Sequence, residues 1–225
     1  MESLLNNRLT PITDAFGFLQ CDLQKAVDAY SAWQTPIQAA RFVRLEQSVL
    51  KGSLEEDLLG LLPLTSVERR RFLFIPTASS WTAFFDNGHQ STDAFSPLSY
   101  LARTIGCQAL RVFYIPDGTF VSKHPARLFE LYGPDKTDWL NVIRSVGAIS
   151  DKRWVFHATG AVQSFEQTDR YALKTVKDRF TPEMLDQYLR ALGIRAFQED
   201  FYLSTQAILL SKQGPVAPNL REFGL

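Results

Sequence analysis

The residues best suited to chemistry lie between positions 81 and 93. Histidine next to carboxylates can ligate a metal ion or act as a general base. Polar residues also gather in a turn after a strand simply because such a turn faces water. We therefore treat this stretch as a candidate binding site without assigning it a reaction. Its residues are Trp81, Phe85, Asp86, Asn87, His89 and Asp93.

The chain lacks the motifs of the common enzyme and cofactor classes. It has no GxGxxG, GxxxxGK[ST], GxSxG, HExxH or CxxC pattern and no EF-hand loop. With only 3 histidines in the whole chain, a His-rich metal site has few ligands to draw on. Cys107 follows a glycine and leads into an apolar run, where a buried structural thiol fits better than a nucleophile. We expect no metal, no cofactor and no catalytic residue of these kinds.

The candidate site must be positioned by the elements around it. The apolar run 72–75 predicts a central strand, and 81–85 predicts a second strand that returns antiparallel to it. Asp86-Asn87-Gly88 is a strong turn signal, because Asn and Gly tolerate positive φ. Ser96 and Pro97 predict the start of a helix that Gly106 ends, and 110–115 predicts the next strand.

Before this stretch the chain reads as two strand-then-helix units. Residues 15–20 predict a strand, and Asp22 caps a helix that we expect Pro36 to break. The alternating segment 40–50 predicts a strand with one wet face. A capping-box pattern at Ser53 and Glu56 then predicts a short helix before Pro63.

C-terminal to the candidate site, the sequence consists mainly of short strand-like segments. The pieces 127–132, 141–149, 153–159 and 161–166 are separated by turn residues, which favours an antiparallel meander. Thr181, Pro182 and Glu183 predict a helix that ends at Gly193. A last strand is expected at 201–210.

These elements indicate an α+β fold: a mixed or antiparallel sheet with about four helices, its C-terminal half richer in antiparallel strands. We expect residues 1–225 to form one domain, with terminal arms at 1–13 and 214–225. A subdomain boundary near 117–126 is the alternative.

The composition bears on partners and compartment. Lys plus Arg and Asp plus Glu are 24 each, so the chain lacks the positive field typical of nucleic-acid binding. No signal peptide and no apolar run of about 18 residues is visible, which argues against secretion and a membrane span. Two cysteines are too few for a disulfide scaffold. We expect a cytoplasmic protein that binds neither nucleic acid nor membrane.

Aromatic side chains are plentiful on the predicted strands, where they serve either as core or as anchors of an interface. They include Trp81, Phe84, Phe85, Trp139, Trp154 and Phe156. Our leading hypothesis is a non-enzymatic protein that presents the 81–93 region to a protein partner. The rival is a small hydrolase using His89 with Asp86 or Asp93. A third reading is a scaffold that self-associates through an aromatic face.

The general make-up resembles small neutral bacterial proteins of an accessory kind, including some that neutralise toxins by binding them. The comparison is one of type and rests on no shared motif.

Overall fold

The structure is a computed structural model that describes residues 2–90, 94–118 and 124–225. Its main feature is a nine-stranded antiparallel sheet with the order β2-β10-β4-β5-β1-β6-β7-β8-β9. A second sheet pairs β3 with β11. Four α-helices accompany the sheets among the described residues, so the expected α+β class is confirmed.

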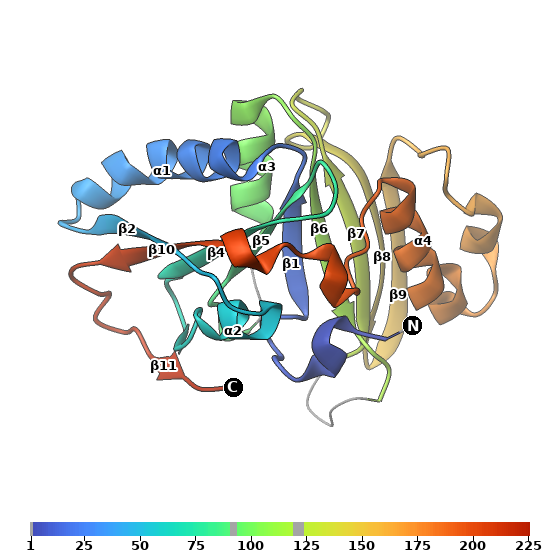
Figure 1. The fold of residues 1–225 in the computed structure, drawn as a ribbon. Coiled ribbons are helices and arrows are strands. Elements are labelled where there is room, and N and C mark those ends of the chain that lie inside the picture. Colours follow the sequence, from blue (N-terminus) through green and yellow to red (C-terminus); the bar gives the residue numbers. More distant parts are fainter. Residues whose placement is uncertain (1, 91–93, 119–123) are drawn as a thin grey trace.

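The sheet carries different layers on its two faces (Figure 1). Helices α1 and α3 pack together on one face, α1 over β2 and β4 and α3 over β1, β6 and the start of the meander, where Phe74, Phe84 and Leu98 are fully buried. Helix α4 and the C-terminal segment cover the other face, where Phe129, Leu185 and Tyr188 are fully buried. The sheet therefore has two apolar sides, which explains why its central strands read as continuous apolar runs.

The first half of the chain follows the predicted order of elements, except that the strand at 64–65 was not expected and that the third helix begins at Phe95, with Ala94 rather than Ser96 as its N-cap. The bounds are β1 (Ala15–Leu19), α1 (Leu23–Ala39), β2 (Arg44–Val49), α2 (Leu54–Leu59), β3 (Leu64–Thr65), β4 (Arg71–Pro76), β5 (Thr82–Asp86), α3 (Phe95–Ile105) and β6 (Ala109–Ile115). The capping box of Ser53 and Glu56 forms as expected. Gly106 ends α3 with a φ of 74°, a conformation that glycine adopts without strain.

The expectation that Pro36 breaks the first helix is wrong. Helix α1 runs one turn further, to Ala39, with Pro36 inside it. A proline near the C-terminal end of a helix removes one backbone donor, and the few residues after it limit the cost. The buried side chains of Gln34 and Gln38, which hydrogen-bond at 2.9 Å across this turn, support the extension.

The second half contains the expected meander. Its strands are β7 (Ala126–Tyr132), β8 (Val142–Asp151) and β9 (Arg153–Gly160), each antiparallel to the one before. Lys152 makes the tight link between β8 and β9 with a φ of 60°. The predicted strand at 161–166 does not form, and this segment instead folds across the β8/β9 end, where Glu166 pairs with Arg144.

The remaining elements complete the main sheet late in the chain. They are α4 (Pro182–Ala191), β10 (Ile208–Gln213), β11 (Glu222–Phe223) and the 3₁₀ helices η1 (Leu4–Asn7), η2 (Thr168–Ala172), η3 (Val176–Arg179), η4 (Glu199–Phe201) and η5 (Ser204–Gln206). Strand β10 is shorter than the expected 201–210 because η4 and η5 occupy its first part.

Both chain ends differ from the expected arms. Leu4, Leu9 and Ile12 are buried in the core, and Phe223 of β11 pairs in the second sheet. The segment between β6 and β7, where a subdomain boundary was the alternative, lies partly outside the described residues, and its flanking strands pair with each other.

Candidate binding site on the open sheet face

Two of the predicted site residues are core aromatics. Trp81 is 2% exposed, and its Nε1–H donates to the carbonyl of Leu192 at 2.9 Å. Phe85 is fully buried and stacks on Phe16 with ring centroids 5.3 Å apart. Burial leaves neither ring free to act as an anchor on the surface.

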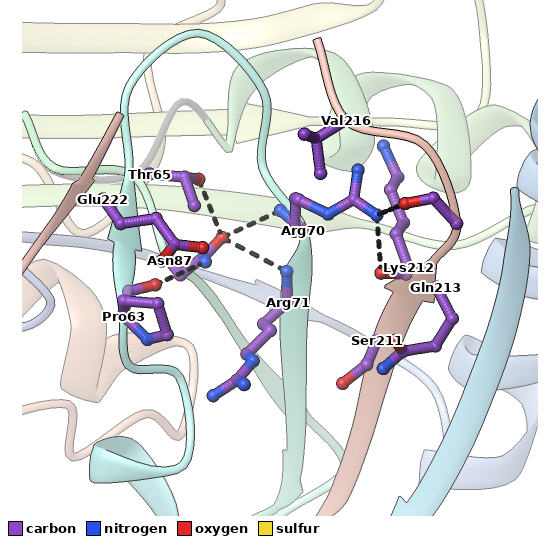
Figure 2. Close-up of a pocket in the computed structure, with 11 residues that line it drawn as sticks. Pro63, Thr65, Arg70, Arg71, Asn87, Ser211, Lys212, Gln213, Val216 and Glu222 are labelled. Carbon is purple, nitrogen blue, oxygen red and sulfur yellow. Dashed lines mark hydrogen bonds between the residues drawn. The ribbon is translucent and has the colours of Figure 1, made fainter. Parts of the chain in front are cut away.

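Asn87 is the centre of a buried polar cluster (Figure 2). Its Oδ1 accepts from the backbone N–H groups of Arg70 and Arg71 at 2.9 and 3.1 Å. Its Nδ2 donates to the carbonyl of Pro63 at 2.8 Å. We call Asn87, Arg70 and their backbone partners the Asn87 cluster. It joins Asn87 to two earlier segments, at Pro63 and at Arg70–Arg71.

Arg70 extends this cluster to the C-terminal segment. Its guanidinium donates to the carbonyls of Lys212 and Gly214 at 2.8 and 3.3 Å and pairs with Glu68 at 3.3 Å. The pocket beside it has a volume of about 220 Å³ and is lined by Asn87, Arg71 and Lys212 among others. Most of the strong donors here already bind the protein's own backbone, so the cluster acts as a structural tie.

Asp86 and His89 each contact a different part of the described chain. Asp86 accepts from the backbone N–H of Gly88 at 2.8 Å and lies 3.9 Å from the guanidinium of Arg69. His89 stacks on Phe223 with ring centroids 4.6 Å apart. Asp93 lies outside the described residues.

A different set of polar residues meets on the sheet beyond β1. The registers of β6 to β9 place their outward side chains in three cross-strand rows, each continuous across four strands. The first row is polar, the second mixed and the third aliphatic. The rows are Arg111–Glu130–Ser145–Thr159, Phe113–Leu128–Gly147–His157 and Ile115–Ala126–Ile149–Val155. We call the side chains of these rows the open sheet face.

This face is exposed mainly along β9 and half-buried along β6, whereas Ala126, Leu128, Glu130 and Ser145 on its two central strands are buried. Ile149 and Val155, which are direct cross-strand partners, are 39% and 53% exposed. Thr159 is exposed, whereas Phe113 and His157 are half-buried. Neighbouring exposed aliphatic side chains on a sheet face indicate a candidate contact surface.

Ser145 and His157 form a pair at the centre of the open sheet face. Ser145 Oγ lies 3.1 Å from His157 Nε2 across the β8/β9 ladder. Gly147 makes this contact possible, because a Cβ there would lie 2.4 Å from His157 Cε1. The imidazole can therefore lie flat over β8 and reach Ser145.

A buried carboxylate lies next to this pair. Glu130 is 4% exposed, accepts a hydrogen bond from the hydroxyl of Tyr132 and lies 3.5 Å from the guanidinium of Arg111. Burial lowers the pKa of His157 below its ordinary value of 6.5, and the negative charge of Glu130 opposes this shift. The Nε–H of Arg111 is buried and finds no acceptor among the described residues.

Trp139 projects beside these rows from the loop between β7 and β8. Its ring is 54% exposed and contacts Phe95 of α3 at a centroid distance of 5.5 Å. The backbone beneath it is held by Thr137, whose hydroxyl bonds to both the N–H and the carbonyl of Trp139. A large ring is thus displayed on a well-bonded loop.

Two hollows flank Trp139, each of about 440 Å³. One extends over the open sheet face and is lined by Arg111, Glu130 and His157 among others. The second lies toward Ile143 and Ala161 and shares Trp139 and Thr159 with the first. An exposed aromatic ring between two hollows, with a few convergent polar groups, has the character of a binding surface.

One feature of the sequence, the isolated Gly147, could have indicated this site. An isolated glycine inside a strand pattern, as at Gly147, indicates close approach by another group. Trp139 was among the aromatics considered as anchors, and it alone of the six is more than half exposed. The pairing of Ser145 with His157 depends on strand register, which the sequence does not state.

In the part of the chain that the structure describes, no helix is both long and apolar enough to cross a membrane. Within the same residues no group of three or more His, Cys, Asp or Glu side chains is arranged to hold a metal ion. Comparisons with protein-family models, with curated proteins and with solved structures give no match to this chain.

Proposed function

We propose that this protein acts by binding another protein on its open sheet face. The observation that carries the proposal is Trp139, a ring that is 54% exposed, held by a bonded loop and flanked by two hollows. Tryptophan and arginine are enriched among the residues that dominate binding energy at protein interfaces. The proposed function, protein binding, is the one that the sequence suggested, but we place it on the open sheet face instead of residues 81–93.

The face favours a partner with particular chemistry. Ile149 and Val155 offer exposed aliphatic contact at one end, where a partner would bury apolar side chains. Arg111, at the other end, lines the hollow with a partly exposed guanidinium, which suits a carbonyl or carboxylate of the partner. The neighbouring Glu130 lowers the net positive charge there, which makes a polyanion such as nucleic acid a poor fit.

The edge strands provide a matched test. Val155 on β9 and Val49 on β2 are exposed valines, 53% and 58%, on the two opposite edges of the same sheet. We expect Val155→Asp to reduce retention of the partner from native lysate, and the affinity of the purified pair, by about tenfold or more, because it buries a charge at the interface. Val49→Asp should leave both unchanged.

Two results would contradict the proposal. One is that the wild type and Val155→Asp retain the same proteins from the lysate in the same amounts. The other is an equal loss with both aspartate variants while both remain folded by circular dichroism. Retention of the protein's own chain as the main species would favour the self-associating scaffold.

A hydrolase is the second candidate, because Ser145 Oγ lies 3.1 Å from His157 Nε2 in a hollow. A serine nucleophile also needs backbone N–H groups that bind the oxyanion. Ser145 lies within β8, which pairs with strands on both sides there, so its neighbouring N–H groups belong to the ladders. Its side chain is also buried, with 3% of the residue exposed.

A fluorophosphonate probe separates the two functions. Binding predicts that Ser145 is not labelled. Labelling of Ser145 that disappears in His157→Ala would establish the hydrolase instead.

A further inference from the structure

The two cysteines of the chain lie next to each other, although they are 86 positions apart in sequence. The β1/β6 ladder pairs Leu19 with Ala109, and the N–H of Gln20 donates to the carbonyl of Gln108 at 2.9 Å. Cys21 and Cys107 each come one residue beyond this bonded pair, past the end of the ladder. The thiols are close enough for each to perturb the pKa of the other.

The position of the pair fits a disulfide bond. Opposed residues of an antiparallel ladder have Cα atoms roughly 4.5–5.5 Å apart, within the roughly 4.4–6.8 Å that disulfides span. Cys21 directly precedes Asp22, the cap of α1, and Cys107 directly follows Gly106, which ends α3. A bond between them would tie the start of one helix to the end of the other.

Small molecules have access to the pair. Both cysteines are half-buried rather than buried, contrary to the expectation for Cys107. Cys21 also lines a hollow of about 690 Å³ together with Gln24, Ser80 and Gln206 among others. A structural thiol inside a core has no such opening beside it.

We propose that Cys21 and Cys107 form a redox-active dithiol that reacts with low-molecular-weight disulfides, of which oxidised glutathione is one. The Cys107 thiolate attacks one sulfur of the small disulfide, forms a mixed disulfide and releases one small thiolate. Cys21 then loses its proton to solvent, attacks Sγ of Cys107 and expels the second small thiolate. The two cysteines lose two electrons, and the small disulfide gains them.

The order of attack follows from the surroundings of each sulfur. The neighbouring thiol of Cys21, the positive charge of Lys25 and the nearby backbone N–H of Gln20 lower the pKa of Cys107, and burial opposes them. The pKa of Cys21 is raised, first by the neighbouring thiol of Cys107 and then by partial desolvation. We take Cys107 as the attacking thiol and Cys21 as the resolving one, and the two serine variants test this order.

The test uses the folded full-length protein with oxidised glutathione, followed by mass spectrometry under non-reducing conditions. We expect the wild type to lose two hydrogens and become resistant to thiol alkylation, and dithiothreitol to reverse both changes. Cys21→Ser keeps a hydrogen-bond donor to Cys107 and should stop at a glutathione adduct on Cys107. Cys107→Ser should form an adduct at least about tenfold more slowly.

Two outcomes would overturn the proposal. The first is a wild type that retains two alkylatable thiols. The second is a wild type that accumulates a stable glutathione adduct without the internal disulfide. Equal adduct rates in the two serine variants would overturn the assignment of Cys107 as the attacking thiol. Circular dichroism of each variant confirms that the folded protein is being compared. The result is independent of the binding proposal, because the dithiol and its hollow share no residue with the open sheet face.

Discussion

The Asn87 cluster and the open sheet face are both rich in polar side chains, but they use them in opposite ways. In the Asn87 cluster the amide and the guanidinium of Arg70 bind backbone atoms of the protein itself. On the open sheet face Arg111, His157 and Thr159 border a hollow and keep part of their surface exposed. Polar residues with used hydrogen bonds hold a fold, whereas those beside open space are available to a partner.

The largest expected effect is on the Asn87 cluster. Asn87→Ala leaves the N–H groups of Arg70 and Arg71 and the carbonyl of Pro63 without their partner, so we expect the free energy of unfolding to fall by about 3 kcal/mol. Urea unfolding measures this. The exposed Asn219 is the control, and Asn219→Ala should change stability by less than about 0.5 kcal/mol. Equal effects at the two positions would remove the basis of the comparison.

A smaller effect is expected from Gly147→Ala. The new methyl group would lie 2.4 Å from His157 Cε1, so the ring must move and lose its contact with Ser145. We expect a loss of about 1–2 kcal/mol in the free energy of unfolding, typical of overpacking. The imidazole signals of His157 in NMR spectra should shift at the same time.

Gly224→Ala serves as the control for this change, because a Cβ at Gly224 has no atom within 4 Å. Unchanged imidazole signals in Gly147→Ala would mean that Gly147 does not position the ring.

The smallest effect concerns pH. Because burial lowers the pKa of His157 in the folded state, the unfolded state binds the proton more readily. The stability that comes from neutral His157 is fully present above its ordinary pKa of 6.5 and is lost as the pH falls through the lowered folded value. In unfolding titrations at a series of pH values, His157→Gln should lose less stability on acidification than the wild type.

The exposed His124 provides the control, and His124→Gln should follow the wild type. If His157→Gln and the wild type lost stability in parallel, the open sheet face would not hold a neutral histidine.

Local signals in the sequence predicted most of the elements. The capping box at Ser53 and the Thr181–Pro182 start of α4 appear where they were expected, because a cap depends only on residues within one turn. The meander of β7 to β9 also follows from local alternation and turn residues. The end of α1 was misjudged because Gln34 and Gln38 hydrogen-bond beside Pro36, and proline rules do not include such contacts.

The site could not be predicted in the same way. Ser145 and His157 are twelve positions apart and meet through the register of β8 and β9, which a one-residue shift would have destroyed. Trp81 and Trp139 were both considered as interface anchors, but they are 2% and 54% exposed. What separates them is whether another layer covers that part of the sheet, and this depends on the whole topology.

Strand β10 lies between β2 and β4, although it follows them by more than 120 residues in the chain. Until residue 213 has left the ribosome, β2 has no neighbour in the sheet, and β4 exposes one unpaired edge. Completion of the sheet therefore waits for the synthesis of β10 and depends on a long loop closure. A chain that lacks β10 would leave β2 unpaired and one edge of β4 open to other chains. Such unpaired strand edges favour aggregation.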